Sequence, residues 1–432
     1  MSGMLPAIAS VGKGLLVAAV LLGVVPVLAG TYQVLLAAGH GWRNHYGRCA
    51  PYFPRTAIII PAWNEAAVIG GSIDRLMRLE YPPESVRVYV VDDASSDATP
   101  DVVRAKAREH PGRVVHLRRE HGGQGKAHTL NHGLAAALAD GWAQALLIMD
   151  ADVIFPPPSL RLLSRHLADP RVGAVTGYIR EGSRPGNYLT RFIAFEYVTA
   201  QAAARRGQNV LGTLACLAGG AQLHARANLE AIGGQIDTSS LAEDTVTTFK
   251  TQLAGHRAVF DPHAVVIAEE PGQVAALWRQ RLRWARGNVQ VTLRYRRLWF
   301  RPSAPHGLGG VSFGLFWFSV LLQPVFMVLA TAGLVTLFFT DPVLASHAFR
   351  GVWIVTALAY LLITLLTLLI DPTTGRRCWR QAVMFPGLVS LALIFYALFP
   401  GPASYLFDQL LSLTGVTLTH RAQRGIVLVI YL

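Results

Sequence analysis

Between residues 56 and 153, short apolar runs alternate with longer stretches in which apolar residues recur every three or four positions. The apolar runs predict buried β-strands in the segments TAIII, which stops at Pro61, VRVYVVDD, GRVVHLRR and ALLIMDADV. The amphipathic stretches predict helices over 66–79, 99–109 and 127–140. Strands that alternate with helices at this spacing indicate a parallel α/β sheet with crossover helices.

An uncharged apolar run precedes this segment. Residues 14–38 carry no charge over about 25 positions, and a helix needs about 20 apolar residues to span a bilayer. We interpret residues 14–38 as an uncleaved transmembrane helix that follows an N-terminal tail, residues 1–13.

The C-terminal region, residues 311–432, contains further apolar runs. Three of them predict spans, over 311–340, 352–370 and 382–400. The first is too long for one span, so we expect it to begin in the membrane interface and to cross from near Ser319. A last piece, 403–418, is interrupted by Asp408 and is interfacial or re-entrant. Four spans are predicted, and five or six stay open.

Arginine placement predicts the orientation, because short cytoplasmic flanks of spans are rich in Arg and Lys. The arginines that fall on one side of the predicted membrane are Arg43, Arg48, Arg55, Arg376, Arg377 and Arg380. The loop expected on the opposite side, 341–351, has only Arg350. Residues 39–310 are therefore expected to face the cytoplasm, in a multi-pass protein of the cell (inner or plasma) membrane.

The composition of the chain is compatible with several kinds of binding partner. Hydrophobic residues make up 52% of the chain and charged ones 15%, with a net charge of +13. Nucleic acid, anionic lipid and phosphorylated small molecules all suit such a charge. The cysteines Cys49, Cys216 and Cys378 lie far apart, so the sequence predicts neither a disulfide framework nor a zinc site.

Two predicted strands end in acids, at the edge of the sheet where ligands of α/β proteins collect. Asp92 and Asp93 follow one strand, and with Asp97 they could equally cap the next helix. Asp150 and Asp152 follow another strand, and in an extended segment both carboxylates would point the same way. Such a pair could bind one Mg²⁺ or Mn²⁺, since both ions favour oxygen ligands.

Two further segments carry candidate chemistry. The glycine-rich loop EHGGQGKAH could present Lys126 to a phosphate or could be a plain surface loop, and it lacks the Walker and dinucleotide spacings. In SLAEDT, Glu243 and Asp244 precede a helical run that ends at Gly255. Asp244 could cap that helix, or it could take a proton from an attacking hydroxyl as a general base.

The stretch LWRQRLRWARGNVQVTLRYRRLWFR has eight arginines and no acid. A helix over 278–293 would collect one apolar seam: Trp278, Leu282, Ala285 and Val289. Trp278 and Trp299 would face lipid in an interfacial helix.

The opposite region of this helix carries Gln280, Arg283 and Trp284. Arg283 suits a diphosphate and Trp284 suits a sugar ring. We therefore assign both a site and a lipid-facing surface to this stretch.

The ordered motifs PAWNE, VVDDASSD, GKA, DAD, AED and QRLRW resemble those of the membrane-embedded family 2 glycosyltransferases, which include synthases of hyaluronan, chitin, poly-N-acetylglucosamine and cellulose. The resemblance covers residues 58–284. It implies a cytoplasmic α/β domain of the GT-A (nucleotide-diphospho-sugar transferase) fold over 39–274, and QxxRW and interfacial helices over 275–310. It also implies inverting transfer from a nucleotide sugar.

The resemblance implies roles for the acids and the lysine. Glu65 and Asp93 would hold the uridine of the donor, with Asp92 close by. Lys126 would sit near the phosphates. Asp150 would contact the nucleotide and, with Asp152, would hold Mg²⁺ or Mn²⁺ on the diphosphate.

The resemblance also implies the reacting groups. Asp244, next to Glu243, would deprotonate the acceptor hydroxyl. Gln280, Arg283 and Trp284 match QxxRW, so Arg283 would stabilise the departing UDP and Trp284 would stack under the acceptor sugar. Ala242 replaces the usual Thr of the family's TED, and CLAGGAQ stands where cellulose synthases have FFCGS.

These departures favour a compact synthase that uses UDP-GlcNAc or UDP-glucose and exports a β-linked polysaccharide, alone or with an accessory subunit. The alternative is transfer of one sugar to a lipid, as ceramide glucosyltransferases do. A transporter or scaffold would explain the spans but not the ordered acids. Nucleic acid is not expected as a partner, because no recognised module accompanies the basic stretch and membrane lipid accounts for its charge.

Overall fold

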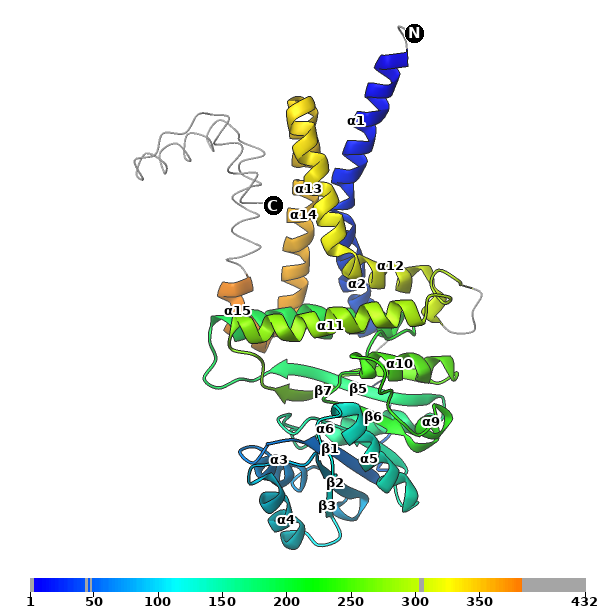
Figure 1. The fold of residues 1–432 in the computed structure, drawn as a ribbon, viewed down its shortest axis with the longest axis vertical. Coiled ribbons are helices and arrows are strands. Elements are labelled where there is room, and N and C mark those ends of the chain that lie inside the picture. The colour runs from blue at the N-terminus through cyan, green and yellow to red at the C-terminus, as the bar shows by residue number, and fades with distance from the viewer. Residues whose placement is uncertain (1–3, 43–45, 47–48, 303–306, 383–432) are drawn as a thin grey trace. The chain divides into compact units, whose positions relative to one another are not determined.

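The computed structural model describes residues 4–42, 46, 49–302 and 307–382, and the chain forms two compact units (Figure 1). The first, the helical unit, comprises Met1–Tyr32, Phe318–Leu368 and Trp379–Leu432. The second, the α/β unit, comprises Gln33–Trp317 and Leu369–Cys378. Each unit is described separately below.

A seven-stranded sheet forms the centre of the α/β unit, in the order β3-β2-β1-β4-β6-β5-β7. Its strands are β1 (Thr56–Ala62), β2 (Val86–Asp92), β3 (Val114–Arg118), β4 (Ala145–Ile148), β5 (Val172–Glu181), β6 (Gln222–Ala225) and β7 (Arg257–Ala268). β3, β2, β1 and β4 are parallel, which confirms the prediction for this half of the chain. β6 is antiparallel to both of its neighbours, so the sheet as a whole is mixed.

The strand β1 runs through Pro61 to Ala62, so the prediction that Pro61 ends it was wrong. Pairing of β1 with β4 stops at Ile59, whereas pairing with β2 continues to Ala62. Pro61 therefore lies where β1 has only one neighbouring strand, and a missing N–H costs little there.

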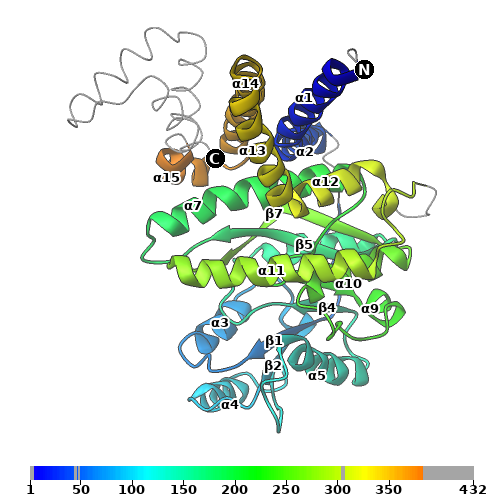
Figure 2. The same cartoon turned by 45° about the horizontal axis from the view of Figure 1, so that its top comes forward.

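Helices cover both faces of the parallel half of the sheet (Figure 2). α3 (Ile69–Leu76), α4 (Thr99–Glu109) and α6 (Ser159–Ser164) pack against Ile58 and Ile60, which point to one face of β1. α5 (Lys126–Ala139) packs against Ala57 and Ile59 on the other face. The alternation follows from the two-residue period of a strand. Two predicted helices match within one residue, and the predicted helix 66–79 is shorter.

Gly133 allows α5 to lie close to the sheet. A Cβ at this position would stand 2.6 Å from Val91 Cγ2 and 2.7 Å from Ile59 Cγ2. The start of α5, which carries Lys126, is thereby fixed beside the ends of the strands.

The second half of the unit is mainly helical. Its elements are α7 (Tyr188–Tyr197), the π-helical turn Val198–Ala203, α8 (Ala204–Val210), α9 (Arg226–Ala231), α10 (Glu243–Leu253) and α11 (Val274–Arg294). The short 3₁₀ turns of the unit are Pro83–Ser85, Arg165–Ala168 and Gly307–Gly309. A reciprocal capping box between Asn187 and Thr190 begins α7.

The helix α11 confirms the predicted helix over 278–293, but its buried side is not the predicted apolar seam. Gly287 and Val291 are buried, whereas Trp278 is 68% exposed and Val289 45%. The helical period located the apolar stripe of α11 correctly. However, α11 packs on the rest of the α/β unit through a different face, the one that carries Gly287 and Val291. The stripe is an exposed surface of the α/β unit.

Trp299 does not face outward as predicted. Its ring stacks on Trp317 at 5.3 Å and on Phe313 at 6.1 Å, and Phe249 of α10 packs against all three rings. The Trp299 indole donates a hydrogen bond to the Thr292 carbonyl at 3.1 Å. This aromatic cluster anchors α10 to the segment that follows α11.

The helical unit holds the apolar helices. Its elements are α1 (Met4–Leu22), the first part of α2 (Val25–Trp42), the end of α12 (Val311–Leu321), α13 (Gln323–Thr340) and most of α14 (Pro342–Ile370). Among the described residues, three helical stretches are long and apolar enough to cross a membrane: Ile8–His40, Gln323–Thr340 and Pro342–Ile370. α1 packs on α13, and Lys13 pairs with Asp341 at 2.7 Å.

Several boundaries differ from the prediction. The first helix begins at Met4 within the expected tail, and a turn at Gly23 and Val24 divides it. The second span begins at Gln323 after the short α12, close to the expected Ser319. The predicted loop 341–351 is instead the start of α14, because Pro342 at its first turn initiates a helix well. The predicted span 382–400 and the piece 403–418 lie outside the described residues apart from position 382.

The segment between the predicted spans 352–370 and 382–400, which carries Arg376, Arg377 and Arg380, is the helix α15 (Pro372–Ala382). Asp371 precedes it and accepts hydrogen bonds from Thr374 N at 3.0 Å and from Thr373 Oγ1 at 2.6 Å. The Asp371 side chain thus satisfies one of the free N–H groups of the first turn, that of Thr374.

Candidate active site

The acids that follow β1, β2 and β4 meet at one edge of the sheet. β1 lies between β2 and β4, and the strand order reverses between β1 and β4. Such a reversal opens a crevice beyond the carboxyl ends of the strands. Glu65, Asp93 and Asp150 come from the loops around this crevice.

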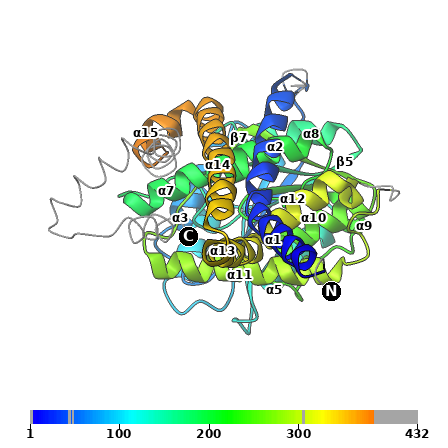
Figure 3. The same cartoon turned by 90° about the horizontal axis from the view of Figure 1, so that it is seen from above.

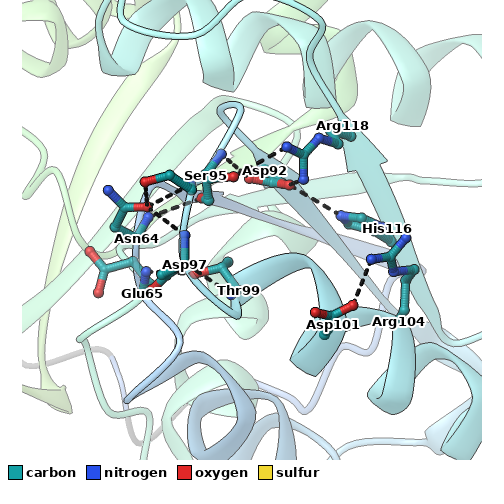
Figure 4. Close-up of polar contacts among 11 residues, drawn as sticks. Asn64, Glu65, Asp92, Ser95, Asp97, Thr99, Asp101, Arg104, His116 and Arg118 are labelled. Atoms are coloured by element: carbon teal, nitrogen blue, oxygen red, sulfur yellow. Dashed lines mark hydrogen bonds and ion pairs between the residues drawn. The ribbon is translucent and has the colours of Figure 1, made fainter.

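Asp92 is wholly buried, and Figure 4 shows its contacts with Ser95 and Arg118. Its Oδ1 accepts from Ser95 N at 2.8 Å, and its Oδ2 accepts from Arg118 Nη1 at 2.8 Å. Both oxygens are therefore engaged in holding the loop after β2 to β3. Of the two alternatives for Asp92, this favours the structural one.

Asp93 lies nearer the surface, under the glycine-rich loop. Its carboxylate accepts from the Arg119 guanidinium and, at 3.0 Å, from Gly123 N. Arg119 also contacts Gln124. Asp93 consequently shapes the loop that leads to Lys126.

Asn64 and Asp97 close the loop after β1 onto the loop after β2 (Figure 4). Asn64 has a positive φ of 58°, which Asn tolerates better than most residues, and its Oδ1 accepts from Ser96 N at 2.9 Å. Asp97 Oδ1 accepts from Thr99 N at 2.9 Å, at the first residue of α4. Asp97 is not the N-cap residue of α4, which is Ala98, but its side chain satisfies the N–H of Thr99 at the start of the helix.

Glu65 differs from these residues, because no hydrogen bond of the close-up ends on its carboxylate (Figure 4). Its backbone N–H is fixed by Thr99 Oγ1 at 2.8 Å. Burial raises the pKa of Glu65, and the nearby carboxylates of Asp152 and Asp150 raise it further. A cationic or hydrogen-bond-donating ligand would relieve this repulsion.

The Asp150–Asp152 segment is a turn rather than the extended strand that was predicted. Val153 N donates to Asp150 O at 3.2 Å across it. Burial raises the pKa of Asp152, with the neighbouring charge of Asp150 as the next cause. Carboxylate oxygens are the ligands that Mg²⁺ and Mn²⁺ favour. Among the described residues, however, the oxygens of Glu65, Asp150 and Asp152 do not all lie within 4.8 Å of one another, so these acids are not arranged as a closed metal site.

Lys126 forms an ion pair with Asp150. Burial opposes the charge on the ammonium, but Asp150 outweighs it and, with Glu243 and Asp244, raises the pKa of Lys126. The lysine is thus held cationic at the first residue of α5, facing the crevice acids.

Asp244 lies on the opposite side of a glycine pair from Asp150. A Cβ at Gly219 would stand 3.4 Å from Asp244 Oδ2 and 3.7 Å from Lys126 Nζ, and one at Gly220 would stand 3.5 Å from Asp150 Oδ2. The CLAGGAQ segment therefore runs between Asp244 and Asp150. Gly219 and Gly220 have no side chains, which leaves room for a small group there.

Asp244 does not cap α10. The helix begins at Glu243, so Asp244 is its second residue, and its Oδ1 accepts from Thr245 N at 2.7 Å. Burial raises the pKa of Glu243, and the charge of Asp244 adds to this, while Lys126 and Arg283 oppose it.

The QxxRW residues lie on α11, but they do not form one equivalent face. Gln280 donates from Nε2 to Glu270 Oε2 at 3.2 Å, and its buried Oε1 has no hydrogen-bond partner among the described residues. Trp284 is 37% exposed, and the Arg281 guanidinium lies 4.2 Å from its ring centre. Arg283 is exposed, on the side of Glu243.

Three side chains that hold the site were missed in the sequence: Arg119, Glu270 and Arg281. Glu270 accepts from the Tyr197 hydroxyl at 2.6 Å, and Arg281 pairs with Glu196 at 2.7 Å. Arg119 directly follows β3, which was predicted, so attention to every residue after a predicted strand would have found it. Glu270 follows β7, which was not among the predicted strands.

Comparison with known proteins now identifies the class. The model of the family described as "Glycosyltransferase like family 2" matches residues 54–287, more than half of the chain. The chain belongs to glycosyltransferase family 2. It is an enzyme of the transferase class, as the resemblance implied.

The curated relatives differ in product. "Probable glycosyltransferase YdaM" of Bacillus subtilis is 29% identical over 327 residues, which are 74% of this chain and 75% of that protein. A poly-β-1,6-N-acetyl-D-glucosamine synthase of Staphylococcus epidermidis is 26% identical, over 55% of each chain. The β-monoglucosyldiacylglycerol synthase of Synechocystis is 30% identical over 57% of this chain and 50% of that one. The chain thus matches about half the length of the last two.

A solved structure confirms the fold of this family 2 glycosyltransferase. The mannosyltransferase PcManGT of Pyrobaculum calidifontis, in complex with GDP-Man and Mn²⁺, aligns with a TM-score of 0.54 and 24% identity, over 88% of this chain and 99% of that one. The predicted GT-A fold, with its mixed sheet, is therefore present, and the chain also carries helices apolar enough to span a membrane.

Proposed function

We propose that this glycosyltransferase moves a sugar from UDP-GlcNAc or UDP-glucose, with inversion, onto a growing β-linked polysaccharide. One observation carries the proposal: Lys126, Asp150 and Asp244 meet around Gly219 and Gly220 at the carboxyl edge of the sheet. A cation, an acid proposed to hold the metal ion and an acid proposed as the base thereby lie close together.

The donor would lie across the crevice. Glu65 and Asp93 would hold the uridine, and Lys126 would exchange Asp150 for the diphosphate. Asp150 and Asp152 would hold Mg²⁺ or Mn²⁺, which supplies charge neutralisation to the diphosphate when bound. Asp92, being fully hydrogen-bonded and buried, would act through the loop that it orders.

The transfer would be a single displacement. Asp244 takes the proton of the acceptor hydroxyl, whose oxygen bonds to the anomeric carbon as the bond to the UDP oxygen breaks. Lys126 and Arg283 stabilise the charge that grows on the diphosphate. Attack on the face opposite the leaving group turns an α-linked donor into a β-linkage.

The acceptor would enter beside α11. Trp284 offers an indole face to a sugar ring, and the buried Oε1 of Gln280 offers an acceptor to one of its hydroxyls. Glu243 completes the catalytic set by adjoining Asp244 and Arg283.

Polymer synthesis is supported by a relative that carries the name of a poly-N-acetylglucosamine synthase. The relative named as a glucosyldiacylglycerol synthase supports the second candidate, transfer of one sugar to a lipid. Both proposals place the α/β unit in the cytoplasm, at a cell membrane that the apolar helices cross, with lipid around them and an accessory export subunit as a further partner.

Product analysis tests this function. The full chain in lipid vesicles is incubated with Mn²⁺ and one UDP-sugar at a time, and the products are sized. We expect one donor to give a high-mass, glycosidase-sensitive polymer. Asp244→Asn should lower its yield by about 10²- to 10⁴-fold. Asp101→Asn, an exposed change on α4, serves as the control. A labelled lipid with one sugar would favour the second candidate, and no transfer from any UDP-sugar would refute both.

A further inference from the structure

Glu270 is a half-buried acid of the loop between β7 and α11, and the proposed chemistry gives it no role. Its Oε1 accepts from the Tyr197 hydroxyl at 2.6 Å, and its Oε2 accepts from Gln280 Nε2 at 3.2 Å. Its backbone N–H donates to Ser183 Oγ at 2.9 Å. The backbone and both carboxylate oxygens of Glu270 are therefore held in place by three different segments of the α/β unit.

The contact with Glu270 determines which way round the Gln280 amide lies. An ionised carboxylate only accepts hydrogen bonds, so the amide must turn its NH₂ group toward Glu270. The amide oxygen, Oε1, is then left for another donor. This atom is buried and has no hydrogen-bond partner among the described residues. A buried polar atom without a partner is costly, so a ligand that donates a hydrogen bond to it gains affinity.

The electrostatics of Glu270 show that it depends on these partners in turn. Burial raises the pKa of Glu270, while the hydrogen bonds from Tyr197 and Gln280 and the charge of Arg281 oppose the rise. A carboxylate removed from water is stabilised by donors of this kind. The contact between Glu270 and Gln280 is therefore favourable for both side chains.

The end of α7 supports two residues of the QxxRW motif. Tyr197 is linked to Gln280 through the carboxylate described above. The preceding residue, Glu196, pairs with Arg281 at 2.7 Å, and the Arg281 guanidinium lies 4.2 Å from the ring centre of Trp284. α7 and α11 lie on the same side of the sheet in the α/β unit (Figure 3). Two successive residues of α7 thus order the part of α11 that is proposed to meet the acceptor.

The loop that carries Glu270 is also tied to the turn with the proposed metal-binding acids. Ile154 N donates to Ile267 O at 2.7 Å, and Ile267 N donates to Ile154 O at 2.9 Å, so the two segments pair as antiparallel neighbours. Asp152 precedes Ile154 by two residues, and Glu270 follows Ile267 by three. Through Glu270, the Gln280 side chain is therefore positioned relative to that turn.

We propose that Glu270 is a positioning residue of the acceptor site, which orients the Gln280 amide so that its oxygen accepts a hydrogen bond from a hydroxyl of the acceptor sugar. The inference rests on the proposed function, in which Gln280 and Trp284 meet that sugar. Glu270 itself contacts neither the sugar nor the diphosphate and acts through Gln280.

Kinetics with a soluble acceptor test the proposal. The full chain in lipid vesicles is given Mn²⁺, labelled UDP-GlcNAc or UDP-glucose, and free N-acetylglucosamine or glucose as the acceptor. In Glu270→Gln the one remaining oxygen does not serve both Tyr197 and Gln280, so the Gln280 amide loses its fixed orientation. We expect the KM for the acceptor to rise by about tenfold, the effect of one hydrogen bond, and the KM for the donor to change much less.

A double-mutant cycle separates positioning from a general loss of structure. Gln280→Met should by itself raise the acceptor KM by about tenfold. Adding Glu270→Gln to it should raise the KM no further, because both changes remove the same contact. Tyr197→Phe, which keeps both carboxylate oxygens for Gln280, should have a smaller effect. Glu230→Gln, a change to an α9 acid that pairs with Arg226 at 2.7 Å, is the matched control.

Several outcomes would overturn the inference alone. They are an unaltered acceptor KM in Glu270→Gln or Gln280→Met, additive effects of these two changes, and a rise in KM that falls on the donor. Transfer by the wild type to lipid but to neither free sugar would overturn it as well. In each case, release of UDP by the wild type leaves the glycosyltransferase function standing. No transfer from either donor to any acceptor would refute the proposed function and the inference together.

Discussion

Lys126, at the start of α5, forms an ion pair with Asp150, at the end of β4. One of these residues is proposed to contact the donor phosphates and the other the nucleotide and the metal ion. Because of this contact, a donor phosphate can bind Lys126 only if it replaces Asp150 as the partner of the lysine. The lysine should therefore add less to donor affinity than an unpaired ammonium would, because its contact with Asp150 is lost when the phosphate contact forms.

Lys126→Gln should lower kcat/KM for the UDP-sugar by about tenfold to a hundredfold, because it removes a charge-assisted contact to the diphosphate. Initial rates of UDP release at varied donor concentration measure the change. Lys106→Gln on α4, which pairs with Asp74, is the matched control. An unaltered kcat/KM would place Lys126 outside the donor site.

Gly287→Ala should lower kcat more than it raises KM for the donor. Its Cβ would stand 2.7 Å from Ala242 Cβ and 3.0 Å from Ala242 N, so the start of α10 with Asp244 must shift. Misplacing a catalytic group by about 1 Å can cost about 10²-fold. Steady-state kinetics check this, with Gly351→Ala as the control, where an added Cβ meets nothing within 4 Å. Full activity in Gly287→Ala would indicate that α10 tolerates displacement.

His224, buried in β6, should make the fold sensitive to acid. Burial lowers its pKa from 6.5 to about 4, so the folded chain holds it neutral while the unfolded chain takes up a proton. Stability is therefore fully present above pH 6.5 and falls as the pH drops from 6.5 to about 4.

His224→Gln should remove this part of the pH dependence, by up to about 3 kcal/mol across that window. Thermal unfolding midpoints of the full chain in detergent, from pH 7 to pH 4, measure the difference between wild type and variant. His121→Gln in the exposed glycine-rich loop is the control. Parallel curves for wild type and His224→Gln would contradict the prediction.

Asp371→Asn should destabilise the α/β unit by about 3 kcal/mol, because it removes the charge of a buried pair with Arg180 at 3.1 Å. The Asp371 carboxylate also accepts from Tyr178 Oη at 3.2 Å. Its pKa is about 2, since hydrogen bonds from Thr373 and Thr374 outweigh its burial. The loss should therefore be constant from pH 7 to about 5 and shrink only as the pH falls further toward 2. Urea titration measures it, and a change within error would show that the contact is dispensable.

Local patterns predicted the parallel half of the fold well. β1 to β4 and the helices between them follow from apolar runs and helical periods that depend on neighbouring residues only. The strands β5, β6 and β7 were not predicted, because no regular alternation of strands and helices marks this part of the sequence and the partners of β6 lie far away in the chain. Periodicity located the apolar stripe of α11 but could not reveal that the stripe is exposed, since burial depends on tertiary packing.

For the site, chain topology allowed part of the grouping. Acids that follow parallel strands must gather at one edge, so Asp93 and Asp150 could be grouped from the sequence, whereas Glu65 was assigned through the family resemblance. What the sequence could not reveal is which of them are already satisfied. The carboxylate oxygens of Asp92 and Asp97 already accept hydrogen bonds from backbone N–H groups and, for Asp92, from an arginine. Only the structure shows this difference from Glu65.

The contacts of Asp371 with Arg180 and Tyr178 also limit where the chain can be shortened without loss of the α/β unit. The family match ends at residue 287, yet the α/β unit includes Leu369–Cys378, a stretch that returns only after three apolar helices. A fragment trimmed to the family match would leave Tyr178 and Arg180 facing an empty place in the fold. The α/β unit is therefore not complete when the chain is cut at residue 287. A shortened protein would need residues 369–378 as well, either fused to it or added as a peptide, before its activity could represent that of the full chain.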